Sequence, residues 1–346
     1  MNIKSLLLGS AAALAVVSGA QAADAIVAAE PEPMEYVRVC DAFGTGYFYI
    51  PGTETCLKVG GRVRFDVQAA DSYSPNSDNG WNTRSRAELY LDSASDTEYG
   101  ALKTQIIARW DFDGDYNDGQ HTTTKLIAAN ITLAGFLVGL ADSQYSSFTN
   151  YAGDIINDDV VYYGPFETNQ ITYNYDGGNG FKAVISLEDD STDDDDYMVD
   201  VVGGIGYSTG TFGFTVVGGY DQSVEEGAVK ARLDGTFGAF SAFVMGGWNS
   251  DGDKLNKYAS SNFGGAASGI GWGDWAVWGG LGYSFSDTLA ANLQLAYTDS
   301  EVFAAAANVK WNPVPGLLIQ PEVTYTNWDS IDEDQWNGMV RFQRTF

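Results

Sequence analysis

Apolar and polar residues alternate with a period of two along most of this chain. In residues 59–68, for example, Val63 and Phe65 fall on one face of an extended segment, while Arg62 and Arg64 fall on the other. Segments of about ten residues with this alternation are typical of strands that cross a bilayer at a tilt. Sixteen such strands are predicted, near residues 58–69, 81–91, 99–109, 124–133, 135–143, 169–175, 180–189, 197–207, 211–221, 228–237, 239–248, 274–285, 288–298, 302–312, 316–328 and 335–346.

The connections between these strands differ in length in a regular way. After even-numbered strands they are mostly short turns, such as 134, 176–179 and 208–210. After odd-numbered strands they are mostly long and acidic, at residues 70–80, 110–123, 144–168, 190–196, 222–227, 249–273, 299–301 and 329–334. Both termini lie on the turn side. This segregation favours an all-β fold, a sixteen-stranded antiparallel transmembrane β-barrel with long extracellular loops and short periplasmic turns, over a soluble β-sandwich.

Aromatic residues mark the ends of the strands and of the chain. They suit the interfacial girdles of a membrane barrel, although the edge of an ordinary core could look similar. The last residue, Phe346, shares a face with Phe342 and Val340, and this ending resembles the assembly signal of bacterial outer-membrane proteins. Arg344 stands where an apolar residue is usual, but at the membrane rim its charged end can extend toward water. Aromatic residues near strand ends include Trp81, Tyr99, Trp110, Trp248 and Trp311.

Residues 1–22 carry the features of a secretory signal peptide. Lys4 gives a positive start, residues 6–17 form an apolar run, and Ala-Gln-Ala at 20–22 is a cleavage site. The apolar run is too short to span a bilayer, and no other run reaches the ~18 to 20 uncharged residues of a transmembrane helix. We therefore expect the mature chain to begin at Ala23 and to be exported through the periplasm to the outer membrane.

Export bears on the state of the only two cysteines, Cys40 and Cys56. The residues between them are typical of a short hairpin with turns, and the compartment is oxidising, so a disulfide is predicted; two free buried thiols are the alternative. The sequence contains no C-x-x-C motif, so the cysteines do not suggest redox catalysis. Residues 23–57 are accordingly expected to form an N-terminal periplasmic or lumenal segment with a disulfide hairpin, and residues 58–346 the barrel.

Charge and composition exclude several classes of function. The chain has 46 acidic and 18 basic residues, a formal net charge of −28, so it has no basic face for nucleic acid. Its 45% hydrophobic and 14% aromatic content argues against disorder. The single histidine, His121, has no accompanying nucleophile motif, so neither an enzyme nor a cofactor is expected.

Three stretches carry a closer resemblance to a known family. They are the run from Cys40 through Gly-Thr-Gly-Tyr-Phe-Tyr-Ile-Pro-Gly to Cys56-Leu-Lys-Val-Gly-Gly, the run Leu-Ala-Gly-Phe-Leu-Val-Gly-Leu at 133–140, and the ending Val-Arg-Phe-Gln-Arg-Thr-Phe at 340–346. These resemble the alphaproteobacterial porins of the Rhizobium and Brucella type. The resemblance covers the mature chain and implies a sixteen-stranded homotrimeric channel for small hydrophilic solutes, surrounded by outer-membrane lipid and lipopolysaccharide.

Inward-facing cations suggest how such a channel would work. Burying them on one wall without water would be costly, so a wet lumen explains them better than a packed core. In general porins, which this family resembles, the third long loop folds inward and narrows the channel. Acids on that loop facing a basic wall would set a transverse field; ordinary solvated charges on an open lumen, or a dedicated anion site, are the alternatives. The basic wall is predicted from Arg62, Arg64, Arg84, Arg86, Lys103, Arg109 and Arg341, and the constriction-loop acids are Asp154, Asp158, Asp159 and Glu167.

Other candidate sites are weaker. The sequence at 111–115 resembles the start of an EF-hand, but Tyr116 and Thr122 stand where the turn glycine and the bidentate glutamate should be, so an acidic loop without metal is expected. The acidic run at 193–196 is expected to be solvated, with divalent cations bridging it to lipopolysaccharide phosphates as the alternative. Gly204 and Gly206 lack the strand-to-helix context of a nucleotide-binding motif.

Three functional classes remain open. The favoured one is a general porin, a water-filled passive diffusion channel. A substrate-selective channel would need aromatic residues along the lumen, for which Trp278 and Trp328 are the candidates. A barrel that displays its loops as an adhesin would rely on the Gly-, Ser- and Asn-rich segment 249–273. A weak preference for cations is expected, because the acidic loops surround the mouth.

Overall fold

The computed structural model describes residues 37–70, 80–115, 119–189 and 198–346. The predicted signal peptide and the acidic run at 193–196 lie outside these ranges, as do the side chains of 114–121, His121 included. The chain divides into two units, Met1–Arg38 and Val39–Phe346, and the strands described below belong to the second. None of the helices in the described part is long and apolar enough to cross a membrane.

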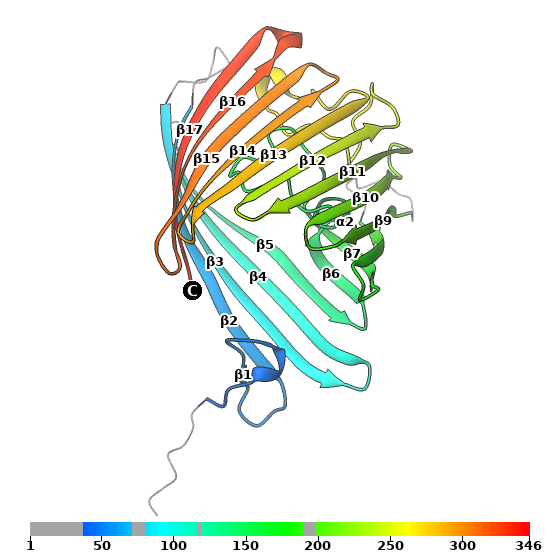
Figure 1. Cartoon of the computed structure of the whole chain (residues 1–346), viewed down its shortest axis with the longest axis vertical. Coiled ribbons are helices and arrows are strands. Elements are labelled where there is room, and N and C mark those ends of the chain that lie inside the picture. Colours follow the sequence, from blue (N-terminus) through cyan, green and yellow to red (C-terminus); the bar gives the residue numbers. More distant parts are fainter. Residues whose placement is uncertain (1–36, 71–79, 116–118, 190–197) are drawn as a thin grey trace, which may run out of the picture. The chain divides into compact units, whose positions relative to one another are not determined.

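Within the described residues, sixteen antiparallel strands form one closed sheet (Figure 1). Each strand pairs with the next along the chain, and the last pairs with the first, so the predicted barrel is confirmed. The strands are β2 (Cys56–Ala70), β3 (Gly80–Thr97), β4 (Gly100–Asp115), β5 (Gly119–Leu133), β6 (Phe136–Asp142), β7 (Glu167–Asp176), β8 (Phe181–Glu188), β9 (Asp200–Ser208), β10 (Phe212–Asp221), β11 (Glu226–Phe237), β12 (Phe240–Asn249), β13 (Trp275–Ser286), β14 (Leu289–Thr298), β15 (Val302–Val314), β16 (Leu317–Trp328) and β17 (Glu333–Thr345).

The barrel closes where β17 runs antiparallel to β2. The pairing extends from Asn337 opposite Ala70 to Thr345 opposite Arg62. The terminal residue continues the ladder, because Phe346 and Gly61 exchange two backbone hydrogen bonds of 3.0 Å. The first and last strands therefore leave no open edge here, which matters in a bilayer, where unpaired backbone groups find no water.

One of the long loops was predicted where the structure has strand. Residues 110–123 were expected to form a long loop, but β4 continues to Asp115 and β5 begins at Gly119. The physical reason lies in the acids of this stretch. Asp111 and Asp113 alternate with apolar residues and stand opposite Arg86 and Arg84 of β3, so they belong to the barrel wall. The prediction of a loop there was wrong.

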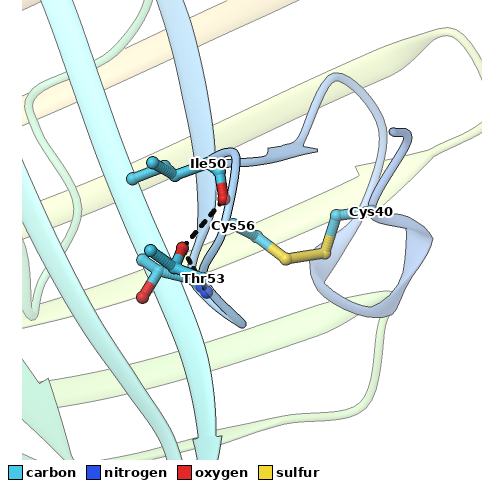
Figure 2. The surroundings of a disulfide bond; sticks show 5 residues. Cys40, Ile50, Thr53 and Cys56 are labelled. Carbon is cyan, nitrogen blue, oxygen red and sulfur yellow. Dashed lines mark hydrogen bonds between the residues drawn. A yellow bond between two sulfur atoms is a disulfide. The ribbon is translucent and has the colours of Figure 1, made fainter. Parts of the chain in front are cut away.

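The N-terminal hairpin is held to the first barrel strand. The short helix η1 (Asp41–Phe43) and the strand β1 (Phe48–Tyr49) precede β2, and β1 pairs with it. Cys40 and Cys56 form the predicted disulfide, which Figure 2 shows beside the turn in which Thr53 Oγ1 donates to the Ile50 carbonyl at 3.0 Å. The bridge joins residues 16 apart, so it stabilises this region locally.

Two loops fold into the barrel interior. We call residues 143–166 loop L3 and residues 250–274 loop L6; L3 contains the short helix α2 (Gln144–Ser147) and L6 the turn η2 (Gly265–Ala267). A further short helix, η3 (Asp329–Ile331), connects β16 to β17. A hydrophobic cluster joins both loops to the inner faces of β9 to β16, and among its members are Tyr145, Val161, Tyr163, Val217, Met245, Tyr258, Trp272, Trp278 and Trp328. The predicted inward-folded third loop is thus confirmed.

The closure of the barrel can be tested at Gly61. A Cβ atom there would lie 2.5 Å from the Glu88 carbonyl oxygen and 2.9 Å from the Phe346 ring. We expect Gly61→Val to lower the free energy of unfolding by about 1–3 kcal/mol, as overpacking does. Unfolding can be followed by the heat-dependent mobility of the barrel in SDS gels. Gly246→Val is the matched control, since a Cβ there meets no atom within 4 Å; equal effects of both variants would contradict the prediction.

Candidate functional site

Charged side chains cover the inner faces of β17, β2, β3 and β4 in cross-strand rows. In one row, Arg62, Glu88 and Arg109 stand opposite one another on three successive strands. Glu88 accepts a hydrogen bond from Arg62 Nη2 at 2.9 Å and one from Arg109 Nε at 2.6 Å. The Tyr90 hydroxyl donates a third at 2.6 Å. A buried carboxylate with three donors is well satisfied and holds both arginines in place.

A second row runs from β17 to β4. Asp66 accepts a bidentate pair of hydrogen bonds from Arg341, at 2.8 and 2.9 Å, and a longer contact of 3.5 Å from Arg84. Arg84 Nε also lies 4.0 Å from Asp113 Oδ1. The neighbouring strand positions hold Arg86, whose Nε and Nη2 donate to the Asp111 carboxylate at 2.6 and 3.1 Å.

Arg64 stands apart from these pairs. Its Nε and Nη2 both donate to the side-chain oxygen of Gln343, at 3.1 and 2.9 Å, and among the described residues it forms no salt bridge. We call the six arginines of these rows the arginine wall: Arg62, Arg64, Arg84, Arg86, Arg109 and Arg341. Four carboxylates, those of Asp66, Glu88, Asp111 and Asp113, share the same inner face, so the rows retain two uncompensated positive charges.

The predicted basic residues therefore lie together, with one exception. Lys103 has the same inward phase on β4, but it is exposed and stands opposite Ala94 and Thr132, away from the charged rows. The prediction also missed the acids. Asp66 and Glu88 share the i, i+2 phase of the arginines beside them, and this phase is the signal that could have identified them.

The backbone of loop L3 forms hydrogen bonds with inward side chains of β14 and β16. The Gln294 side-chain nitrogen donates to the carbonyls of Ala152 and Asp158, at 2.8 and 3.0 Å. At the tip of the loop, the Glu322 carboxylate accepts the backbone N–H groups of Ile156 and Asn157, at 2.5 and 2.9 Å. Inward side chains of β14 and β16 thus satisfy the polar backbone of a loop that has left the aqueous mouth.

Three cations on β8 and β11 hold the rest of L3 in the same manner. Lys182 Nζ donates to the Phe148 carbonyl at 3.0 Å, and Arg232 Nη1 to the Tyr151 carbonyl at 2.7 Å. Lys230 is fully buried, donates to the carbonyl of Tyr163 and lies 4.4 Å from the centre of the Tyr145 ring. These cations position the loop.

The predicted loop acids separate into two groups. Asp154 forms a salt bridge of 3.0 Å with Lys310, while its carboxylate stays largely exposed. Asp158 accepts from the Tyr163 hydroxyl at 2.8 Å, and Asp159 from the Asn262 side chain of L6 at 3.1 Å. Among the described residues, no salt bridge joins these acids to the arginine wall.

Glu167, the fourth predicted acid, is the first residue of β7, outside the inward-folded part of the loop. It forms a salt bridge of 3.0 Å with Lys125 of β5. Its assignment to the loop was therefore wrong. The reason is that the strand starts two residues earlier than the alternation indicated.

Burial changes the acidity of the loop carboxyls. Desolvation, and then the neighbouring charge of Asp159, raise the pKa of Asp158 to about 7. Desolvation likewise raises the pKa of Asp159. Near neutral pH, Asp158 therefore exchanges a proton, and the charge of L3 is lower than its sequence implies.

The tryptophans proposed as lumen-lining steps have another role. Trp278 is fully buried, and its Nε1 donates to the Val161 carbonyl of L3 at 3.0 Å. Trp328 is 2% exposed and packs edge-on against Phe263 of L6, with ring centroids 5.2 Å apart. Both rings are covered by loops, so they do not form an aromatic track for a passing solute.

The chain is similar to known proteins over its whole length. A family model described as Porin subfamily matches residues 24–343. Porin Omp2b of Brucella suis biovar 1 is 46% identical over 373 residues, and the match covers 100% of both chains. Porin Omp2a of Brucella melitensis biotype 1 is 46% identical over 378 residues, again with 100% of both chains covered.

Solved structures share the fold at low sequence identity. An anion-selective porin from Comamonas acidovorans has a TM-score of 0.59 at 14% identity, covering 85% of this chain and 100% of that chain. OmpF of Salmonella typhi, in a complex with daunomycin, has a TM-score of 0.59 at 10% identity, covering 84% and 98%. At these identities, the likeness concerns the barrel alone.

The raised pKa of Asp158 predicts a pH dependence. The folded loop binds this proton more tightly than the unfolded chain does, so ionisation as the pH rises through about 7 opposes the folded state. Between pH 6 and pH 8 we expect the free energy of unfolding to fall by about 1 kcal/mol from this group. Near-UV circular dichroism of thermal unfolding in detergent would measure it.

Two variants separate this effect from other titrations. Asp158→Asn should remove that part of the slope, whereas Asp154→Asn, at an exposed carboxylate, should retain it. An unchanged slope in Asp158→Asn would contradict the assignment.

Proposed function

Since the chain belongs to the porin family and forms an outer-membrane channel for passive diffusion, we propose that small hydrophilic solutes cross it along the arginine wall, past loop L3. One observation carries this proposal. On β2, β3 and β4, the side chains of Arg62, Arg84 and Asp113 remain partly exposed, whereas the inner faces of β9–β16 are covered by packed loops.

Exposure supports this position of the water-filled path. The side chains of Arg62 and Arg84 are 26% and 35% exposed, and that of Asp113 is 44% exposed. On the other part of the wall, Met245 and Trp278 are at most 1% exposed. A hydrated ion needs polar partners and room, and in the described interior both coincide at the arginine wall.

The proposed constriction lies between the arginine wall on one side and the acids of L3 on the other. Asp154 is the loop acid best placed to act on passing ions, because its side chain is 67% exposed. Asp158 and Asp159 contribute less charge because they are more buried. Together these groups would select solutes by size, polarity and charge.

The paired carboxylates bear on ion preference. Asp66, Glu88, Asp111 and Asp113 offset most of the charge of the arginine wall, so its attraction for anions is weaker than six arginines imply. The chain as a whole is strongly acidic. We therefore propose a weak cation preference, because acidic surroundings raise the local concentration of cations.

Assembly is part of the same proposal. We propose a homotrimer embedded in outer-membrane lipid and lipopolysaccharide, as the resemblance to this porin family implies. Residues 1–22 would be removed on export, and residues 23–57 would stay in the periplasm or enter the lumen. Small side chains such as Ala305 and Ala307 on the outer face of β15 suit close contact with a neighbour or with lipid. Phe346, which pairs with Gly61, would serve as the assembly signal.

Planar-bilayer recording tests the channel and its preference. The purified protein should give ohmic conductance steps. In a potassium chloride gradient, the reversal potential should have the sign of weak cation selectivity. A reversal potential of the opposite sign would overturn the proposed preference, and absence of steps would overturn the conducting path.

Removing a charge from the arginine wall tests the path itself. Arg84→Gln should raise the cation-to-anion permeability ratio by a factor of about two, because it removes a partly exposed positive charge from the proposed path. Arg344→Gln is the control, since this exposed residue lies at the turn end of β17 and donates to the Pro315 carbonyl. The same ratio in both variants and the wild type would contradict the proposal.

A further inference from the structure

Loop L6 enters the barrel, although its composition predicted a displayed surface loop. Tyr258, Ala259, Ala267 and Trp272 of this loop are all at most 1% exposed. They belong to the hydrophobic cluster that also contains residues of L3 and of the wall. A loop with this much buried apolar surface is held in the interior, which argues against the adhesin hypothesis for the segment 249–273.

Glycines on the inner wall provide space for the aromatic residues of L6. A Cβ atom on Gly219 of β10 would lie 2.6 Å from the Tyr258 ring. One on Gly247 of β12 would lie 2.5 Å from the Trp272 ring. Any other residue at these positions would displace the ring, so the wall and the loop fit each other closely.

L6 also contacts L3 directly. Trp272 Nε1 donates to the Tyr162 carbonyl at 2.5 Å, and the Tyr162 hydroxyl donates to the Lys257 carbonyl at 3.3 Å. The rings of Tyr145 and Tyr258 lie 4.9 Å apart. Hydrogen bonds and ring contacts thus connect the two loops along both arms of L3.

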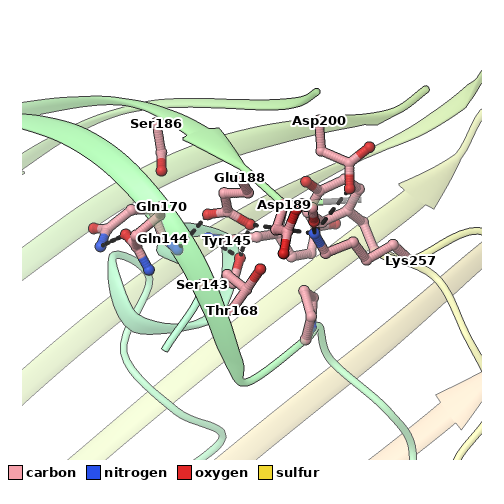
Figure 3. A network of polar contacts seen from close by, with 12 residues as sticks. Ser143, Gln144, Tyr145, Thr168, Gln170, Ser186, Glu188, Asp189, Asp200 and Lys257 are labelled. Atoms are coloured by element: carbon pink, nitrogen blue, oxygen red, sulfur yellow. Dashed lines mark hydrogen bonds and ion pairs between the residues drawn. The ribbon is translucent and has the colours of Figure 1, made fainter. Parts of the chain in front are cut away.

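Lys257 is the ionic centre of this arrangement (Figure 3). Its side chain is 7% exposed, and its Nζ donates to Asp200 Oδ2 at 2.8 Å and lies 4.0 Å from Glu188 Oε2. The Glu188 carboxylate in turn accepts the Ser143 hydroxyl at 2.7 Å and the Gln144 N–H at 2.9 Å, at the start of L3. One lysine of L6 therefore offsets the charge of the carboxylate that anchors the first turn of L3.

We propose that L6 is a second lumenal element and that Lys257 is a positioning residue, which holds L3 in place and so sets the cross-section of the channel. The inference rests on the proposal that L3 borders the conducting path. Without the ammonium group, the buried carboxylates of Glu188 and Asp200, which stand opposite each other on β8 and β9, keep their hydrogen bonds but lose their countercharge, which is strongly unfavourable. This cost falls when L6 moves away from the inner wall, because water then reaches the two carboxylates. L3 thereby loses its packing contacts with L6.

Replacing Lys257 by a neutral side chain of similar length tests the proposal. In Lys257→Met we expect the mean single-channel conductance to rise by a factor of about 1.5 or more, because a partial displacement of L3 widens the channel. The current should also fluctuate more than in the wild type. Liposome swelling should show entry of larger sugars. Lys257→Arg should retain wild-type conductance, because it keeps the cation.

The matched control lies in the same loop. Lys254 also pairs with a carboxylate, that of Glu226 at 2.8 Å, but its side chain is 52% exposed. Lys254→Met should therefore conduct like the wild type. Equal conductance and equal sugar exclusion in Lys257→Met, Lys254→Met and the wild type would overturn the proposal.

A milder variant covers the case in which Lys257→Met fails to assemble. Trp272→Phe keeps the aromatic packing but removes the N–H donated to the Tyr162 carbonyl, so it should assemble and show increased current fluctuations. If Lys257→Met does not assemble, wild-type fluctuations in Trp272→Phe would overturn the proposal. The Arg84→Gln comparison tests the conducting path separately, so failure of the L6 proposal and failure of the path are distinguishable.

Discussion

The pairing of β17 with β2 is the constraint on which the rest of the molecule depends. In a bilayer, every backbone polar group must find its partner within the protein, and a sheet meets this condition only when it closes. The hydrogen bonds between Phe346 and Gly61 extend that closure to the last residue of the chain. Closure also separates two solvents, so that alternate side chains of each strand face lipid or the interior.

A closed barrel of this size has more interior than its wall side chains can fill. The chain fills one part with L3 and L6, whose rings pack against β9–β16, and leaves the other part to charged residues. The loops can enter because the wall satisfies their backbone: Gln294 and Glu322 meet the carbonyls and N–H groups of L3. The position of the loop anchors therefore determines which part of the interior is packed and which part is left to the charged rows.

The strands and the inward phase of the arginines could be predicted from the sequence because both depend on a local period of two. The interior position of L6 could not. Its Gly-, Ser- and Asn-rich composition is typical of exposed loops, and the partners that bury it, such as Gly219 and Gly247, lie on distant strands. The stretch at 110–123 was predicted to be a loop because it is acidic, although its polar and apolar residues alternate as in a strand. The arginines that pair with its acids lie on β3, and a local pattern does not reveal them.

Charge compensation explains why composition is a poor guide to the field inside such a channel. The formal charge of −28 counts residues wherever they lie, whereas an ion in the lumen responds to the nearest uncompensated groups. Arg341 is matched by Asp66, so this pair acts mainly as a fixed dipole. Arg62 and Arg109 share the single carboxylate of Glu88, so one positive charge stays uncompensated in that row. Arg64, bonded to the neutral Gln343, keeps its charge. The electric field inside the barrel therefore depends on pairing across strands, which the cross-strand register determines and a residue count does not.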